Sequence, residues 1–104
     1  MKNGFKDLEG NRVKAVKADD GIHFRFFNGA TLSVFNSVAW SGPAQQSISS
    51  VLGKRLNRSH EFENGVELFF DEGSRLSIDL SDLGYSGPEA IVLRVPGKAT
   101  VVWN

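Results

Sequence analysis

The chain has 104 residues, of which 40% are hydrophobic and 23% are charged, a balance that excludes wholesale disorder and suits one domain spanning 1–104. Twelve Lys and Arg residues balance twelve Asp and Glu residues, and a zero net charge argues against a dedicated nucleic-acid binder. Cysteine is absent, which excludes disulfides, thiolate zinc sites and a cysteine nucleophile. No stretch has the pattern of a signal peptide or a membrane span, so we expect a cytoplasmic protein.

Short β-prone segments separated by glycine turns follow one another along the chain. The pattern predicts strands at residues 12–18, 22–27, 30–36, 55–62, 66–70, 74–80, 90–95 and 99–103. Residues 43–52 fit either a short helix, with Pro43 in its first turn and Gly53 after its end, or a further strand. We therefore expect an all-β fold, a small antiparallel sandwich or partly open barrel with at most one short helix.

A shift of 44 residues superposes two parts of the sequence. Residues 21–34 align with 65–78, and five of the fourteen positions are identical. With a one-residue shift, Trp40-Ser41-Gly42-Pro43 also aligns with Tyr85-Ser86-Gly87-Pro88. We expect a tandem duplication with repeats at about 8–51 and 52–104, each forming a meander, and pseudo-twofold symmetry between them.

Turn chemistry predicts how the strands pair. A three-residue loop ending at Gly29 places Phe24 opposite Leu32, and the same loop ending at Gly73 places Leu68 opposite Leu76. Both glycines then need a positive φ. In each repeat this register gives one apolar face for the core and one polar face for solvent.

Residues able to carry catalysis are few. His23 and His60 stand in no recognised motif, and we expect structural or surface roles for both. Acidic residues near the turns lack the spacing of a calcium loop, and no glycine-rich phosphate loop joins a strand to a helix. The sequence therefore predicts no catalytic residue, no metal site and no cofactor.

Acidic residues are concentrated in the second repeat. Residues 61–89 contain eight acids and one base, which would suit a basic partner if the acids share a surface. The alternative is that they keep a sheet edge soluble. Trp40 and Tyr85 are either paired binding aromatics or plugs at the ends of the sandwich. The candidate partner-binding residues are Glu61, Glu63, Glu67, Asp71, Glu72, Asp79, Asp82, Trp40 and Tyr85.

The order of these landmarks resembles small bacterial all-β immunity proteins that accompany secreted toxins, including those of contact-dependent inhibition systems. The residues that carry the resemblance are the turns ending at Asn28-Gly29 and Glu72-Gly73, Leu52-Gly53, and the segments Pro88-Glu89-Ala90-Ile91 and Val101-Val102-Trp103. The resemblance implies a non-enzymatic inhibitor that binds a toxin domain, in some cases a nuclease. It assigns no site residue.

Three functions remain open on the sequence. The first is an immunity-type inhibitor that binds a basic toxin domain through an acidic face, without nucleic acid or membrane. The second is a small-ligand binding module, and the third is a hydrolase built on one of the histidines. A deep apolar pocket would favour the second, and a cleft that brings histidine and carboxylate within about 3 Å would favour the third.

Overall fold

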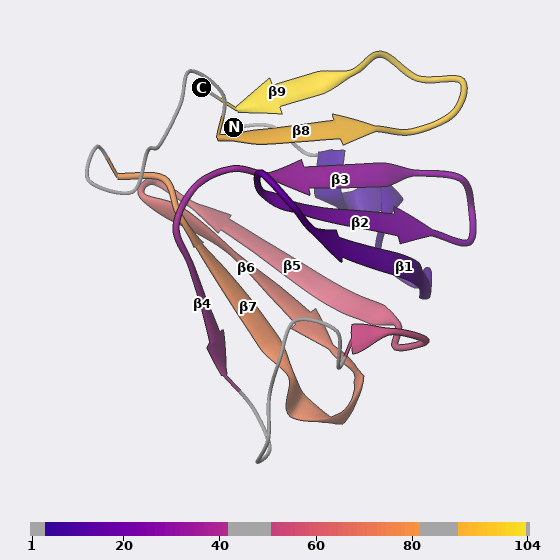
Figure 1. Ribbon diagram of the computed structural model, residues 1–104, viewed down its shortest axis with the longest axis horizontal. Helices are drawn as coiled ribbons and strands as arrows, with labels where there is room; N and C mark the ends of the chain where they lie inside the picture. Colours follow the sequence, from indigo (N-terminus) through magenta and orange to yellow (C-terminus); the bar gives the residue numbers. More distant parts are fainter. Residues whose placement is uncertain (1–3, 42–50, 82–89, 104) are drawn as a thin grey trace.

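The computed structural model describes residues 4–41, 51–81 and 90–103, and the regular secondary structure in these ranges consists mainly of strands (Figure 1). The elements are η1 (Gly4–Asp7), β1 (Val13–Ala18), β2 (Ile22–Phe26), β3 (Thr31–Val34), β4 (Val38–Ser41), β5 (Leu56–Phe62), β6 (Gly65–Phe70), η3 (Asp71–Gly73), β7 (Arg75–Asp79), β8 (Ile91–Arg94) and β9 (Val101–Trp103). The predicted all-β class is confirmed.

The strands form two antiparallel sheets that pack face to face. One sheet has the order β1-β2-β3-β8-β9 and the other has the order β4-β7-β6-β5. Strands β1–β3 and strands β5–β7 are thus two meanders of the same strand order. Each meander gains its fourth strand from the other half of the chain: β4 leaves β3 to pair with β7, and β8 leaves β7 to pair with β3 (Figure 1).

The predicted register of both hairpins is confirmed. Phe24 lies opposite Leu32 in the first hairpin, and Leu68 lies opposite Leu76 in the second. Gly29 and Gly73 have φ values of 91° and 80°. The turn glycine supplies the left-handed residue that this loop length requires, and the apolar residues of both strands therefore share one face.

The chain passes between the sheets after β3 and after β7, and equivalent backbone hydrogen bonds form at both places. The amide of Phe35 donates to the carbonyl of Ala90 at 2.8 Å, and the amide of Asp79 donates to the carbonyl of Ser37 at 2.9 Å. The Asn36 side chain, which is buried, adds a bond from Nδ2 to the carbonyl of Asp79 at 2.7 Å. Equivalent chain segments therefore hold β8 beside β3 and β4 beside β7.

The equivalence of the fourth strands corrects one alignment. Trp40 of β4 pairs with Leu76, whose counterpart Leu32 pairs with Leu93 of β8. Leu93, and not Tyr85, is therefore the structural equivalent of Trp40. Strand β4 is also an addition to the predicted strands, because none of the predicted ranges includes residues 38–41. Residues 43–50 of the ambiguous segment lie outside the described residues.

A second contact joins the sheets at the start of β1 and β5. Arg12 and Arg55, which align in the two repeats, form an antiparallel bridge with each other. On either side of it, the Val13 amide donates to the Lys54 carbonyl and the Leu56 amide donates to the Asn11 carbonyl, both at 2.9 Å. This self-pairing of equivalent segments places the pseudo-twofold relation between the halves at Arg12 and Arg55.

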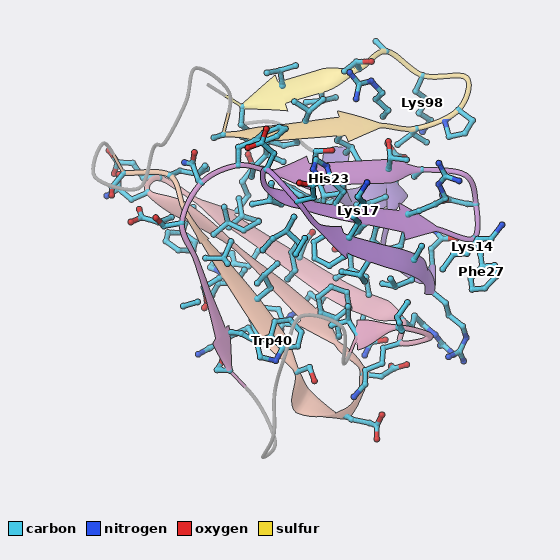
Figure 2. The ribbon with its side chains drawn as sticks, in the orientation of Figure 1. Lys14, Lys17, His23, Phe27, Trp40 and Lys98 are labelled. Atoms are coloured by element: carbon cyan, nitrogen blue, oxygen red, sulfur yellow. The ribbon has the colours of Figure 1, made fainter. Side chains whose placement is uncertain are left out.

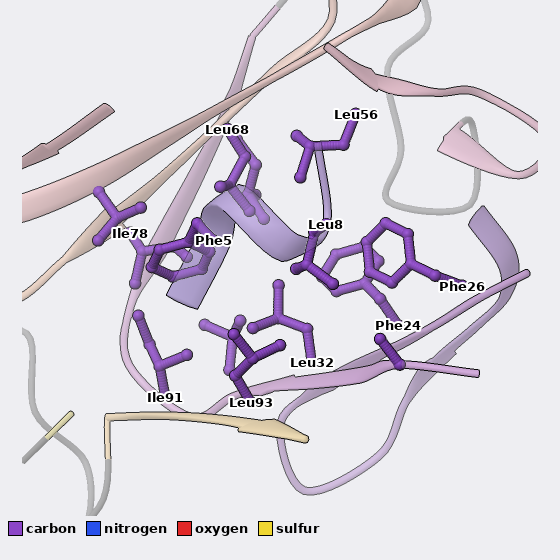
Figure 3. Close-up of a cluster of buried hydrophobic side chains, with 14 of the residues drawn as sticks. Phe5, Leu8, Phe24, Phe26, Leu32, Leu56, Leu68, Ile78, Ile91 and Leu93 are labelled. Carbon is purple, nitrogen blue, oxygen red and sulfur yellow. The ribbon is translucent and has the colours of Figure 1, made fainter. Parts of the chain in front are cut away.

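The core lies between the sheets and is formed by the inward-facing apolar residues of their strands. Phe24, Leu32 and Leu93 of one sheet face Leu68 and Ile78 of the other, and each is at most 2% exposed. Figure 3 shows side chains of both sheets meeting around the short N-terminal segment. Burial of this kind contributes about 1.5–3 kcal/mol for each large apolar side chain.

The N-terminal segment closes one side of the sandwich. Phe5 and Leu8 are buried, and the centre of the Phe5 ring lies 4.7 Å from the centre of the Trp103 ring. Glu9 accepts hydrogen bonds from the amide and the hydroxyl of Ser59, both at 2.8 Å. The segment thereby covers part of strand β5, whose outer edge would otherwise present unpaired backbone groups.

Alanine substitution at the two turn glycines tests this account of the register. We expect Gly73→Ala to lower the free energy of unfolding by about 1 kcal/mol, since an alanine is strained at positive φ. Gly29→Ala should cost more, because its added Cβ would also lie 3.0 Å from Cγ of Pro96, whereas the space at Gly73 is open. Urea unfolding of the two variants measures the difference.

Gly73→Asn is the matched control, because asparagine adopts left-handed conformations more readily than alanine. It should be less destabilised than Gly73→Ala. Unchanged unfolding midpoints in both alanine variants would contradict the register account.

Candidate functional site

The acidic residues proposed for partner binding lie at different places on the sandwich. Glu61 accepts a hydrogen bond from Trp103 Nε1 at 2.8 Å and so links β5 to β9 of the other sheet. Glu63 is exposed at the β5–β6 turn, and Asp71 follows the far end of β6. The six residues of β6 place these two turns roughly 20 Å apart.

Asp71 has a structural role at the β6–β7 turn. Its carboxylate accepts hydrogen bonds from the Arg55 amide at 3.0 Å and from Asn57 Nδ2 at 2.8 Å. These bonds, with the nearby charges of Arg55 and Arg12, hold the pKa of Asp71 below its usual value. Glu72 follows it at positive φ and pairs with Lys54 at 3.1 Å.

Glu67 and Asp79 share the outer face of the four-stranded sheet, as the register predicts, but neither is fully exposed. Glu67 lies 3.4 Å from Arg75 and 3.6 Å from His60. Asp79 accepts bonds from the amide and the hydroxyl of Ser81, which lower its pKa. Both carboxylates are therefore already paired within the chain.

The described acids thus do not form one acidic surface. Trp40 is half-buried on the core side of β4 (Figure 2). The centre of its ring lies 6.1 Å from the centre of the Phe70 ring, so Trp40 contributes to packing. Asp82 and Tyr85 lie outside the described residues. A role of these residues in partner binding stays a prediction.

The outer face of the four-stranded sheet is close to electrically balanced. Besides Glu67 and Asp79 it carries Arg58 and Arg75, and the Arg58 guanidinium lies 4.4 Å from the centre of the Phe69 ring. Phe62 is 44% exposed beside a hollow of about 320 Å³ between β4, β7 and the β5–β6 turn. This face offers little net field to attract a charged partner.

The outer face of the five-stranded sheet is electropositive instead. Two rows of side chains cross it, because residues paired across neighbouring strands lie side by side. One row is Ala15, Arg25, Thr31 and Arg94, and the other begins with Lys17, His23 and Ser33. We call these seven residues the basic face. Figure 2 shows Lys17 and His23 on the neighbouring strands β1 and β2.

The cations of the basic face differ in their surroundings. Arg25 and Arg94 flank Thr31, are both exposed, and form no ion pair in the described part of the chain. Lys17 lies 3.6 Å from Asp19 in the β1–β2 turn, where both side chains are largely exposed, so this pair is worth little in water. No acid belongs to the two rows among the residues described.

His23 is held between two oxygen atoms. Its Nδ1 lies 2.8 Å from the Ser33 hydroxyl, and its Nε2 lies 3.1 Å from the carbonyl oxygen of Asp19. The Phe35 ring packs against the imidazole in a T-shaped contact, with 5.7 Å between ring centres. His23 is thus oriented by backbone and hydroxyl oxygens, and no described carboxylate contacts it as in a catalytic triad.

A hollow of about 380 Å³ opens on the basic face above β1, β2 and β3. Its lining is formed by Ala15, Lys17, His23, Phe24, Arg25, Thr31 and Ser33. The polar groups around it are cations, hydroxyls and one imidazole, which together favour an anionic ligand. The sequence places His23 and Arg25 on the solvent face of a hairpin, but the position of Arg94 beside them follows only from the exchange of β8.

Comparison with protein-family models, curated protein sequences and solved structures finds no match to this chain. The resemblance to immunity proteins therefore stays a prediction. No helix in the parts of the chain that the structure describes is long and apolar enough to cross a membrane. Within the same parts, no group of three or more histidine or acidic side chains could hold a metal ion.

The hydrogen bonds of Asp71 predict an acid-sensitive contribution to stability. A carboxyl whose pKa is lowered in the folded state stabilises the fold above its unfolded pKa, and this contribution is lost as pH falls through the folded value. We expect the stability of Asp71→Asn to fall less than that of the wild type between about pH 5 and about pH 2. Urea midpoints across this range measure the effect.

Glu63→Gln, which removes one exposed turn carboxylate, is the matched control. Parallel midpoint curves for the wild type and Asp71→Asn would show that the turn contacts of Asp71 do not contribute to acid sensitivity.

Proposed function

We propose that this chain is a non-enzymatic binding protein whose basic face holds an acidic surface of a protein partner. The observation that carries the proposal is the charge of that face: Lys17, Arg25 and Arg94 share it, and no acid belongs to its rows in the described part of the chain. Two of these cations have no partner there. Unpaired arginines on a sheet face are suited to bidentate contacts with carboxylates.

A protein partner suits this face better than a nucleic acid does. The face supplies three cations on a chain of zero net charge, whereas binding to nucleic acid commonly depends on neutralising many phosphates. The remaining groups, Thr31, Ser33 and His23, offer short polar contacts around a hollow. Arginine is enriched in protein interfaces, and the two arginines of this face can anchor carboxylates of a partner.

The proposal retains the predicted class of function and reverses the predicted charge. An immunity-type inhibitor that uses this face would cover an acidic surface of a toxin domain, in place of the basic one expected from the sequence. The reversal is supported by the internal pairing of Glu61, Glu67 and Asp71. Carboxylates already bound within the chain have less to offer a partner.

Removing the two unpaired arginines tests the proposal. A fluorescent poly-glutamate peptide serves as the acidic probe, and its binding is measured at low ionic strength and again at about 0.1 M salt, where the field is screened beyond about 10 Å. The wild type should bind, with an affinity that falls as salt rises. The double variant Arg25→Gln/Arg94→Gln should bind at least about tenfold more weakly at low salt, mainly through a slower association rate.

The matched control is Arg58→Gln/Arg75→Gln, which removes the same charge from the outer face of the other sheet. It should bind the peptide as the wild type does. An equal loss in both double variants, or no binding by the wild type, would overturn the proposal. Tighter binding of a single-stranded oligonucleotide than of the peptide at equal charge would replace the protein partner by a nucleic acid.

A further inference from the structure

The hollow of the basic face is surrounded by side chains that can donate hydrogen bonds. Arg25 and Thr31 lie opposite each other across β2 and β3, and His23 lies between Lys17 and Ser33 in the neighbouring row. Five donor-bearing side chains therefore surround a space of about 380 Å³. Its described lining contains no carboxylate, so the polar groups that an oxyanion would meet there are two cations, two hydroxyls and one imidazole.

The bonds of His23 determine which of these donors are available. A carbonyl oxygen can only accept, so Nε2 must carry a hydrogen to bond the Asp19 carbonyl at 3.1 Å. In the neutral imidazole Nδ1 is then an acceptor, and the Ser33 hydroxyl must donate its single hydrogen to it across 2.8 Å. While His23 is neutral, Ser33 therefore has no hydrogen left for an anion.

Protonation of His23 releases that hydrogen. In the imidazolium both ring nitrogens are donors, and each already faces an oxygen atom, the Ser33 hydroxyl on one side and the Asp19 carbonyl on the other. The hydroxyl then accepts from Nδ1 and can donate into the hollow. The same bonds thus hold the ring in either state without a change of rotamer.

We infer that the hollow is an oxyanion site that binds one carboxylate of the acidic partner and takes up one proton from solvent on His23 as it fills. Lys17 and Arg25 supply the charge, and the Ser33 hydroxyl, freed by the proton, supplies a directed hydrogen bond. The inference rests on the proposed function, since it assigns one carboxylate of that partner to the centre of the basic face.

The charged groups around His23 set the sign of the coupling. Lys17 of β1 lies opposite it, and Arg25 lies two residues along β2. The Asp19 carboxylate in the β1–β2 turn is directed to Lys17, and the contact from the end of β3 is the uncharged Phe35 ring. A bound anion offsets the two cations and favours protonation, so the affinity rises as pH falls.

Binding measurements with two probes test the inference on the full chain. The probes are sulfate, whose charge is constant in the range used, and the poly-glutamate peptide. From about pH 8 to about pH 6, where histidine takes up its proton, the wild type should bind both more tightly, by up to about tenfold per pH unit for one coupled proton. Calorimetry in two buffers of different ionisation enthalpy should detect net proton uptake.

Two variants separate the proton from the charge. His23→Gln should abolish proton uptake and the pH dependence of the affinity. Ser33→Ala should weaken binding at about pH 6, where the freed hydroxyl is expected to contribute, more than at about pH 8. Ser77→Ala is the matched control, since Ser77 has the same place opposite Glu67 in the other sheet and should behave as the wild type. Unfolding midpoints establish that each variant is folded.

The outcomes distinguish this inference from the proposed function. Peptide binding without proton uptake, or pH dependence that persists in His23→Gln, would overturn the oxyanion site while the basic face remains a binding surface. Sulfate binding with proton uptake but no peptide binding would overturn the partner's carboxylate as the occupant, in favour of a free anion. No binding of either probe would overturn both proposals.

Discussion

Each half of the chain lacks the strand that would complete its own sheet, and this constraint organises the rest of the structure. Strand β4 follows β3 in the sequence but pairs with β7, and β8 follows β7 but pairs with β3. Without the other half, each meander would expose the backbone donors and acceptors of one strand edge. The two exchanged strands provide hydrogen-bond partners for both edges in the same way. The exchange also brings the two apolar faces together over a shared core.

The exchange also determines which surfaces are left for a partner. The apolar face of each meander is covered by the other, and the N-terminal segment closes one side through Phe5, Leu8 and Glu9. The outer faces of the two sheets remain. They occupy equivalent positions in the duplicated scaffold but differ in chemistry: the pair His23 and Ser33 in one corresponds to Glu67 and Ser77 in the other. Function can diverge on these faces without disturbing the core.

Local pattern was enough to predict the strands of both meanders. Alternation of apolar and polar residues and the turn glycines Gly29 and Gly73 define the hairpins within short stretches of sequence, and the register followed from them. Strand β4 was missed because it belongs to no hairpin: it pairs with β7, 34 or more residues away, whereas β8 is marked locally by the glycine turn that leads to β9. The offset of 44 residues does not extend to it, since the segment that leads to β8 is longer, and Trp40 was therefore matched with Tyr85 instead of Leu93.

The candidate site was less accessible to sequence analysis for a related reason. Acids that are close in the sequence alternate between faces and turns, so Glu61, Glu67 and Asp71 reach three different environments. The basic face, in contrast, combines β1 and β2 with Arg94 from the second half. Charge counts along a chain describe such a surface poorly when strands are exchanged between distant segments, and only the paired rows reveal it.

Native-state hydrogen exchange tests the interlocked exchange of strands most directly. If each sheet is completed by the other half, the protected amides of the β3–β8 and β4–β7 ladders should exchange only through global unfolding, with one common free energy that equals the free energy of unfolding from urea titration. A free energy of opening for either ladder that lies clearly below the global value would contradict the account, because it would show that one half can release the other while remaining folded.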